Sequence, residues 1–179
     1  RASEPYYSFG NGSAMRVSPV GFAYNSVEDV LFHAKRTAEI THNHPEGIKG
    51  AQSTALAILM ARQGAEKEEI RKEIAARFEY DLDRTVAEIR PGYSFDVSCQ
   101  GSVPESIIAF LDSDSFMDAI KNAISLGGDA DTMACIAGGI AEAWYKKIPG
   151  KVVTAVREKL TPDLREIMDR FNETYGCEF

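Results

Sequence analysis

The 179-residue sequence has few cysteines and no long apolar segment. Its three cysteines, Cys99, Cys135 and Cys177, are far apart and form no CxxC pair, so zinc-finger and dithiol chemistry are excluded. We expect reduced thiols in a reducing compartment. No apolar run approaches the roughly 20 residues that cross a bilayer. Residues 1–5 lack the charged-then-apolar pattern of a secretory signal, which predicts a cytoplasmic protein without membrane attachment.

Positive charge is also scarce. The 20 Lys and Arg residues face 27 Asp and Glu residues, which gives a formal net charge of −7. Because neutralising phosphates along a nucleic acid requires clustered cations, this balance argues against a general nucleic-acid-binding surface. An acidic protein can still bind one phosphorylated small molecule through backbone N–H groups or through a metal ion.

Apolar periodicity predicts an all-α fold, a helical bundle in one domain that covers residues 1–179. The length and the 44% hydrophobic content are sufficient for a substantial core. Pro45 suits the first turn of a helix, and the alternating stretch 93–100 indicates a short extended piece. The predicted helices span residues 27–40, 48–63, 66–78, 103–111, 113–125, 132–145, 152–160 and 163–174.

An acidic turn, residues 127–132, precedes one of these helices. Asp129 and Asp131 are two positions apart, so in an extended turn both carboxylates point the same way, and Thr132 adds a hydroxyl. These oxygens are the donors that Mg²⁺, Mn²⁺ or Ca²⁺ prefer. Helix capping is the alternative, and on residue types alone it is the commoner explanation. A metal site would need further ligands from elsewhere.

A glycine loop, residues 10–15, offers a second candidate site. Its glycines permit close backbone approach, and N–H groups at a helix start suit a diphosphate. An ordinary turn is the alternative, because Gly and Asn are frequent in turns generally. The loop matches neither the dinucleotide fingerprint nor the P-loop. His42 and His44 flank Asn43 just before Pro45; their spacing favours a solvent-facing helix cap over a ligand contact or a metal pair.

Four segments, taken together and in order, resemble the ADP-ribosylglycohydrolase family over nearly the whole chain. The resemblance implies an all-helical fold with two Mg²⁺ (or Mn²⁺) ions in a cleft. It also implies metal-dependent hydrolysis of the glycosidic bond of an ADP-ribosylated protein or a small ADP-ribose compound. A relative that binds ADP-ribose or a nucleotide without catalysis is the alternative. The segments are SFGNGSAMR at 8–16, residues 41–51, SVP at 102–104 and GGDADT at 127–132.

The resemblance assigns roles to individual residues. Asp129, Asp131 and Thr132 look like the C-terminal half of the family's metal site, and His42 matches a histidine that faces the ADP-ribose pocket. The SVPESIIAF helix resembles the one beside the adenosine end. The loop that resembles the family's phosphate-binding loop consists of Gly10, Asn11, Gly12, Ser13, Ala14 and Met15.

One part of the family pattern has no counterpart in this sequence. The family normally begins with a helical segment that carries a Gly-Asp and Glu motif and then a second aspartate cluster. Glu46 and Glu105 match no catalytic position, so the catalytic residue is unassigned. We therefore expect this polypeptide alone to be nearly inactive, and to self-associate or assemble with a complementary N-terminal fragment.

Overall fold

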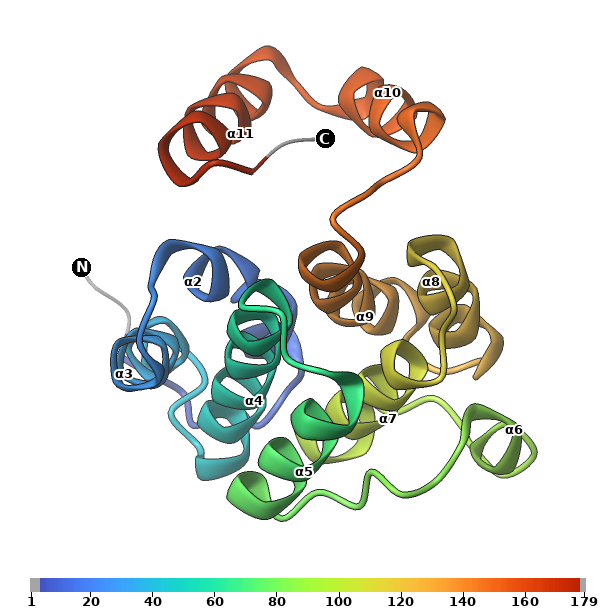
Figure 1. The fold of residues 1–179 in the computed structure, drawn as a ribbon. Coiled ribbons are helices and arrows are strands. Elements are labelled where there is room, and N and C mark those ends of the chain that lie inside the picture. Colours follow the sequence, from blue (N-terminus) through green and yellow to red (C-terminus); the bar gives the residue numbers. More distant parts are fainter. Residues whose placement is uncertain (1–3, 178–179) are drawn as a thin grey trace.

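The computed structural model describes residues 4–177, and all of its regular structure is helical (Figure 1). This confirms the all-α prediction. The eleven helices of the described residues are α1 (Gly12–Met15), α2 (Ser18–Ala23), α3 (Val27–Glu39), α4 (Pro45–Arg62), α5 (Lys67–Phe78), α6 (Val86–Ile89), α7 (Cys99–Leu111), α8 (Phe116–Ser125), α9 (Ala130–Tyr145), α10 (Gly150–Lys159) and α11 (Pro162–Tyr175).

Helices α4 and α9 form the centre of a body made of α1–α9. Helix α4 packs against α1, α2, α3, α5, α7 and α9, and α9 also packs against α7 and α8. Small residues permit this close packing. A Cβ on Gly21 of α2 would lie 2.6 Å from Ile58 of α4, and one on Gly139 of α9 would lie 2.6 Å from the Ser18 hydroxyl. The helices that carry the candidate site are therefore fixed by a tightly packed core.

The stretch 93–98 is an irregular connection, within which the short extended piece expected at 93–100 is small. Only one isolated antiparallel bridge forms there, between Gly10 and Ser98. Helix α7 begins at Cys99, four residues earlier than predicted, because the Ser98 hydroxyl caps it by accepting from the Gly101 N–H at 3.1 Å. Pro104 accordingly lies inside the helix rather than in its first turn. Helices α1, α2 and α6 were not predicted, because four to six residues carry no helical period.

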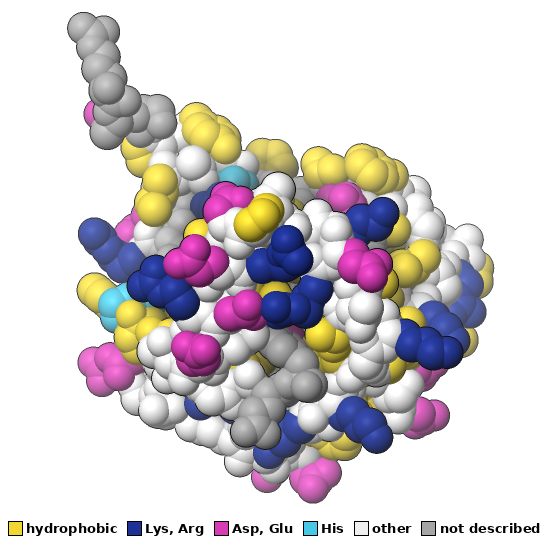
Figure 2. Space-filling model, turned by 90° about the horizontal axis from the view of Figure 1, so that it is seen from above, with side chains coloured by type: hydrophobic (Ala, Val, Ile, Leu, Met, Phe, Trp, Pro, Cys, Tyr) yellow, Lys and Arg dark blue, Asp and Glu magenta, His cyan; other side chains and the backbone are white. Residues whose placement is uncertain are grey.

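Helices α10 and α11 form a C-terminal hairpin above the body (Figure 1). Neither helix has a buried residue. The two are joined by Arg157, whose guanidinium donates to both carboxylate oxygens of Asp169 at 2.6 and 3.0 Å. On the face seen from above, cationic and anionic side chains are interleaved (Figure 2). No helix among residues 4–177 is both long and apolar enough to cross a membrane.

Glu142, near the end of α9, lies at the junction between the hairpin and the body. It lines one cavity of about 360 Å³ together with Arg62 and Lys146, and an apolar cavity of about 220 Å³ next to α10. Burial raises the pKa of Glu142 from 4.5 to about 7. Between about pH 4.5 and pH 7, Glu142 in the folded protein thus keeps a proton that it has already released in the unfolded chain.

This difference predicts how stability depends on pH. Because the pKa is higher in the folded state, the free energy of unfolding should fall as pH rises from about 4.5 to about 7. Glu142→Gln should then be more stable than the parent at pH 8, by about 1–3 kcal/mol. Urea unfolding at pH 5 and pH 8 measures the change. Glu158→Gln, at an exposed position of α10, is the control, and equal behaviour of the two variants would contradict the assignment.

Candidate functional site

The acidic turn begins at Gly127, whose φ of +77° suits glycine, and ends in the first turn of α9. Asp129 occupies the N-cap position, yet within residues 4–177 its carboxylate makes no capping hydrogen bond. Instead, its Oδ2 accepts from the Asn11 side-chain amide at 2.8 Å. Capping, the commoner explanation from sequence, therefore does not account for Asp129. The contact brings the glycine loop and the acidic turn together.

The two carboxylates of the turn lie next to each other. The pKa of Asp131 is lowered, first by hydrogen bonding to the Asp129 carboxyl and then by the backbone N–H groups of Thr132 and of Asp131 itself. Asp131 is exposed, whereas Thr132 is buried and its hydroxyl lies 3.6 Å from the Met15 sulfur. The turn thus presents the Asp129 carboxylate and the Thr132 hydroxyl toward the glycine loop, with the exposed Asp131 carboxylate next to Asp129.

This donor set fits part of a site for a hard divalent cation. Mg²⁺ takes six oxygen ligands in near-octahedral geometry. Within residues 4–177, no group of three or more His, Cys, Asp or Glu side chains is arranged to hold a metal ion. Two carboxylates and one hydroxyl therefore supply about half of an octahedron. The remaining oxygens would come from water, from substrate or from another segment.

The glycine loop is fixed by the segment that leads into α7. The Asn11 N–H donates to the Val97 carbonyl, and the Cys99 N–H donates to the Phe9 carbonyl, both at 2.8 Å. The Cys99 thiol donates to the Gly10 carbonyl at 3.1 Å. Burial raises the pKa of this thiol to about 11, so it stays protonated and able to donate. Backbone pairing on both sides of Gly10 therefore sets the conformation of the loop.

Most N–H groups of the loop are used internally. Gly10 donates to the Ser8 hydroxyl, Asn11 donates to Val97, and both Ala14 and Met15 donate to the Asn11 carbonyl. Among residues 4–177, the N–H groups of Gly12 and Ser13 have no hydrogen-bond acceptor. Ser13 is fully buried, whereas Gly12 is partly exposed, so the Gly12 N–H is the backbone donor that the loop can offer to an anion.

His42 lies against this loop and is buried, not solvent-facing as its spacing suggested. Its Nε2 is 3.1 Å from the position that a Cβ on Gly12 would take. Its Nδ1 is 2.7 Å from the Thr41 hydroxyl, which also accepts from Arg16 at 2.8 Å. We assign the Thr41 hydroxyl as the donor to His42 Nδ1. The hydrogen of the neutral His42 ring is then on Nε2, which lies beside the loop. Burial, and then the Arg16 charge, lower the pKa of His42 and favour the neutral ring.

His44 has the capping role that the sequence suggested for this region. Its Nδ1 accepts from the Glu46 N–H at 3.1 Å, at the start of α4. The rings of Tyr7 and Phe9 pack edge-on against the His44 ring. Tyr7 and Phe9 are nevertheless exposed, as are Phe95 and Val97 on the segment bonded to the loop. Apolar surface therefore flanks the glycine loop.

Three positioning residues were missed by sequence reasoning. Ser102 accepts from the Asn11 amide at 3.1 Å, and Cys99 donates to the loop as described above. Tyr93 donates from its hydroxyl to the Gly101 carbonyl at 2.7 Å, and its ring covers Gly128. Ser102 lies within the SVP segment of the resemblance, which could have identified it. No sequence signal marks Cys99 or Tyr93, since their roles depend on how α7 packs.

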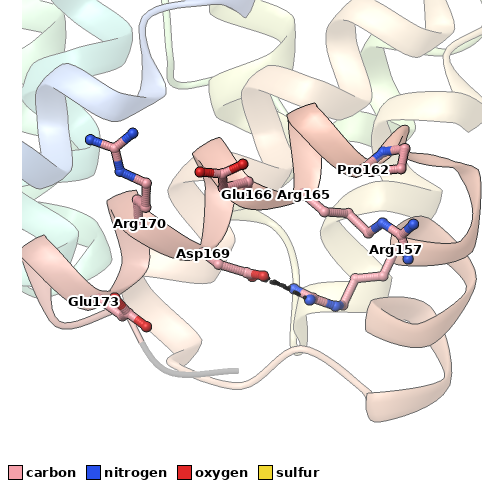
Figure 3. Close-up of a pocket in the computed structure, with 7 residues that line it drawn as sticks. All are labelled: Arg157, Pro162, Arg165, Glu166, Asp169, Arg170 and Glu173. Atoms are coloured by element: carbon pink, nitrogen blue, oxygen red, sulfur yellow. Dashed lines mark hydrogen bonds and ion pairs between the residues drawn. The ribbon is translucent and has the colours of Figure 1, made fainter.

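A further hollow, of about 460 Å³, lies on the C-terminal hairpin (Figure 3). It is lined mainly by charged residues of both signs, including the Arg157–Asp169 pair. The hairpin follows the C-terminal end of α9, whereas the acidic turn is at the N-terminal end. Sixteen residues of α9 separate the two ends, which corresponds to about 24 Å. The hollow therefore belongs to a different part of the molecule from the acidic turn.

Comparison with known proteins gives consistent matches. The sequence model of a family described as ADP-ribosylglycohydrolase matches residues 1–178. The ADP-ribosylhydrolase ARH3 of Homo sapiens is 32% identical over 183 residues, covering 77% of this chain and 50% of that protein. The ADP-ribosylarginine hydrolase Tri1 of Pseudomonas putida is 29% identical over 142 residues, covering 76% of this chain and 38% of Tri1.

A solved structure described as an ADP-ribosylglycohydrolase-related protein complex superposes with a TM-score of 0.74 at 29% sequence identity. The match covers 94% of this chain and 60% of that one. The chain spans about half the length of the ARH3 relatives that it matches. The shared fold thus extends over nearly all of this chain but over only part of its relatives.

The contact between Tyr93 and Gly128 predicts a steric effect. A Cβ on Gly128 would lie 2.4 Å from the Tyr93 ring and 3.0 Å from the Met133 sulfur, so Gly128→Ala should lower the free energy of unfolding by about 1–3 kcal/mol. When Tyr93 is first replaced by Ala, the loss of unfolding free energy caused by Gly128→Ala should be smaller by about 1 kcal/mol. Thermal and urea unfolding measure both. Gly92→Ala, where a Cβ meets open space, is the control; an equal cost with and without Tyr93 would refute the contact.

Proposed function

The chain belongs to the ADP-ribosylglycohydrolase family, and on that premise we propose that it forms the substrate loop and part of the metal site of a metal-dependent hydrolase. The substrate would be an ADP-ribosylated protein or a small ADP-ribose compound, and the bond cleaved would be the glycosidic bond at the distal ribose. The relatives named for ADP-ribosylhydrolase activity support the substrate class. Binding of ADP-ribose without catalysis is the alternative.

The observation that carries the proposal is the position of Asp129. A helix N-cap aspartate normally accepts from its own helix, but this carboxylate is turned toward the glycine loop and accepts from Asn11. Asp131 lies beside it, and Thr132 adds a hydroxyl. An acidic oxygen cluster thus adjoins a loop with two unused N–H donors. Such a pairing suits a ligand that carries both a diphosphate and hydroxyl groups.

The residues of the loop would bind the diphosphate. The donors would be the unused N–H of Gly12 and the assigned Nε2–H of His42, whose ring lies against Gly12. A neutral His42 can donate this hydrogen without carrying a charge. The exposed rings of Phe9 and Phe95 would cover apolar parts of the ligand. These contacts would orient the substrate with its distal ribose over the acidic turn.

Asp129, Asp131 and Thr132 would hold the metal, Mg²⁺ or Mn²⁺, with two ions in a complete site. Metal ions held there would supply Lewis-acid chemistry for orienting the ribose and for activating water. In the hydrolysis, water adds its hydroxyl to the anomeric carbon and its proton to the leaving atom. A nearby carboxylate stabilises the positive charge that develops on the sugar. The general acid–base group is not among the residues assigned here.

The metal site predicts a specific loss of function. Asp131→Asn should weaken Mn²⁺ binding of the chain by about tenfold or more with the fold retained. In the chain assembled with a complementary N-terminal fragment, it should also abolish metal-dependent release of ADP-ribose. Mn²⁺ titration by electron paramagnetic resonance and chromatography of released ADP-ribose are the measurements, with ADP-ribosylarginine and ADP-ribosylserine peptides as substrates. Asp29→Ala, in the first turn of α3, is the control for a general effect of losing a first-turn acid.

Three outcomes separate the candidate functions. Metal-dependent release by the pure chain supports the hydrolase. Tight binding of ADP-ribose without release, unchanged by added metal, supports the binding module. If neither ADP-ribose nor Mn²⁺ binds, and Asp131→Asn changes stability only, the acidic turn has a structural role and both proposals fail.

A further inference from the structure

The side chain of Asn11 connects the two halves of the candidate site. Its Nδ2 donates to Asp129 Oδ2 at 2.8 Å and to the Ser102 hydroxyl at 3.1 Å. We propose that Asn11 is a positioning residue whose amide holds the Asp129 carboxylate against the glycine loop. The acidic turn, which would bind the cation, and the glycine loop, which would bind the diphosphate, then form one rigid unit. The inference deepens the proposed function and rests on it for the identity of the ligands.

The hydrogen-bond partners determine how the Asn11 amide is oriented. Asp129 Oδ2 is the carboxyl oxygen that lies 2.8 Å from the Asn11 amide, and it accepts there. The Ser102 hydroxyl donates its single hydrogen to the Ser98 carbonyl at 2.6 Å and can therefore only accept from Asn11. The NH₂ group must face both partners, because the reversed amide would place an oxygen against two acceptors. Asn11 is also buried, with 6% of its surface exposed, so this arrangement is protected from water.

All three hydrogens of Asn11 that could reach a ligand are already in use. Its backbone N–H donates to Val97, and both amide hydrogens are donated as described. Asn11 therefore contributes to phosphate binding through geometry rather than through a direct donor. The role of direct substrate donor that the resemblance suggested for Asn11 would fall to the partly exposed Gly12, while Asn11 sets where Asp129 points.

The rigid connection has two consequences. First, the Asp129 carboxylate is held in one orientation before any cation arrives, which lowers the entropic cost of binding one. Second, the anchor runs through Ser102 to the backbone of α7, so the orientation depends on α7 as well as on the loop. Outer contacts of this kind typically change metal affinity by 10- to 100-fold when they are removed.

The first test uses the hydrogen bond itself and needs neither metal nor substrate. In nuclear magnetic resonance spectra of the full chain, the Asn11 side-chain NH₂ should exchange with water at least about tenfold more slowly than that of the exposed Asn25. The signal is assigned by its absence in Asn11→Ala. In Asp129→Ala the protection should be largely lost. Solvent-like exchange in the parent protein would overturn the inference, whatever the chain binds.

The second test measures the effect on the cation site. Asn11→Ala should weaken Mn²⁺ binding about 10- to 100-fold, although Asn11 is not a ligand, whereas Ser102→Ala should weaken it less, because the Asp129 contact remains. Backbone amide spectra show whether the fold is retained, and Asn25→Ala is the matched control. Unchanged Mn²⁺ affinity in a folded Asn11→Ala would overturn the positioning role. If the parent protein binds no Mn²⁺ but its Asn11 amide exchanges slowly, the proposed metal site is refuted. The hydrogen bond between Asn11 and Asp129 is then still established.

Discussion

The hydrogen bonds from the Asn11 amide to Asp129 and Ser102 are the constraint on which the candidate site depends. They join a loop near the start of the chain to a turn 118 positions later. Without them, the carboxylate of Asp129 could fold back onto the first turn of α9, where an N-cap aspartate usually bonds. Because it does not, the Asp129 carboxylate faces the glycine loop, and the exposed Asp131 follows it in the turn.

Close packing of the central helices makes this contact possible. Gly50 of α4 leaves room for the Cys99 side chain at the start of α7, since a Cβ there would lie 2.4 Å from the sulfur. Cys99 in turn donates to the Gly10 carbonyl, and Gly47 leaves room for His42 and accepts from the Ser13 hydroxyl at 2.7 Å. The small residues of α4 thus determine where the glycine loop lies, and the loop determines where Asp129 points.

The longer helices could be predicted from sequence because apolar periodicity marks a helix of ten or more residues. Helices α4 and α9 were located to within three residues at each end. Short helices such as α1 were not predicted, and α7 starts earlier because its cap is a single serine. At the candidate site, the sequence predicted Asp129, Asp131 and Thr132 as the oxygen donors, and this stays a prediction. It could not reveal the Asn11 connection, which depends on tertiary packing rather than on spacing along the chain.

The loose attachment of the C-terminal hairpin has a consequence for how such a chain can evolve. Neither α10 nor α11 contributes a buried residue, and the hairpin follows the end of α9 that is remote from the acidic turn. Mutations there change solvent-facing side chains while the central packing stays intact. Substitutions in the hairpin can therefore change this surface without altering the packing around Asn11.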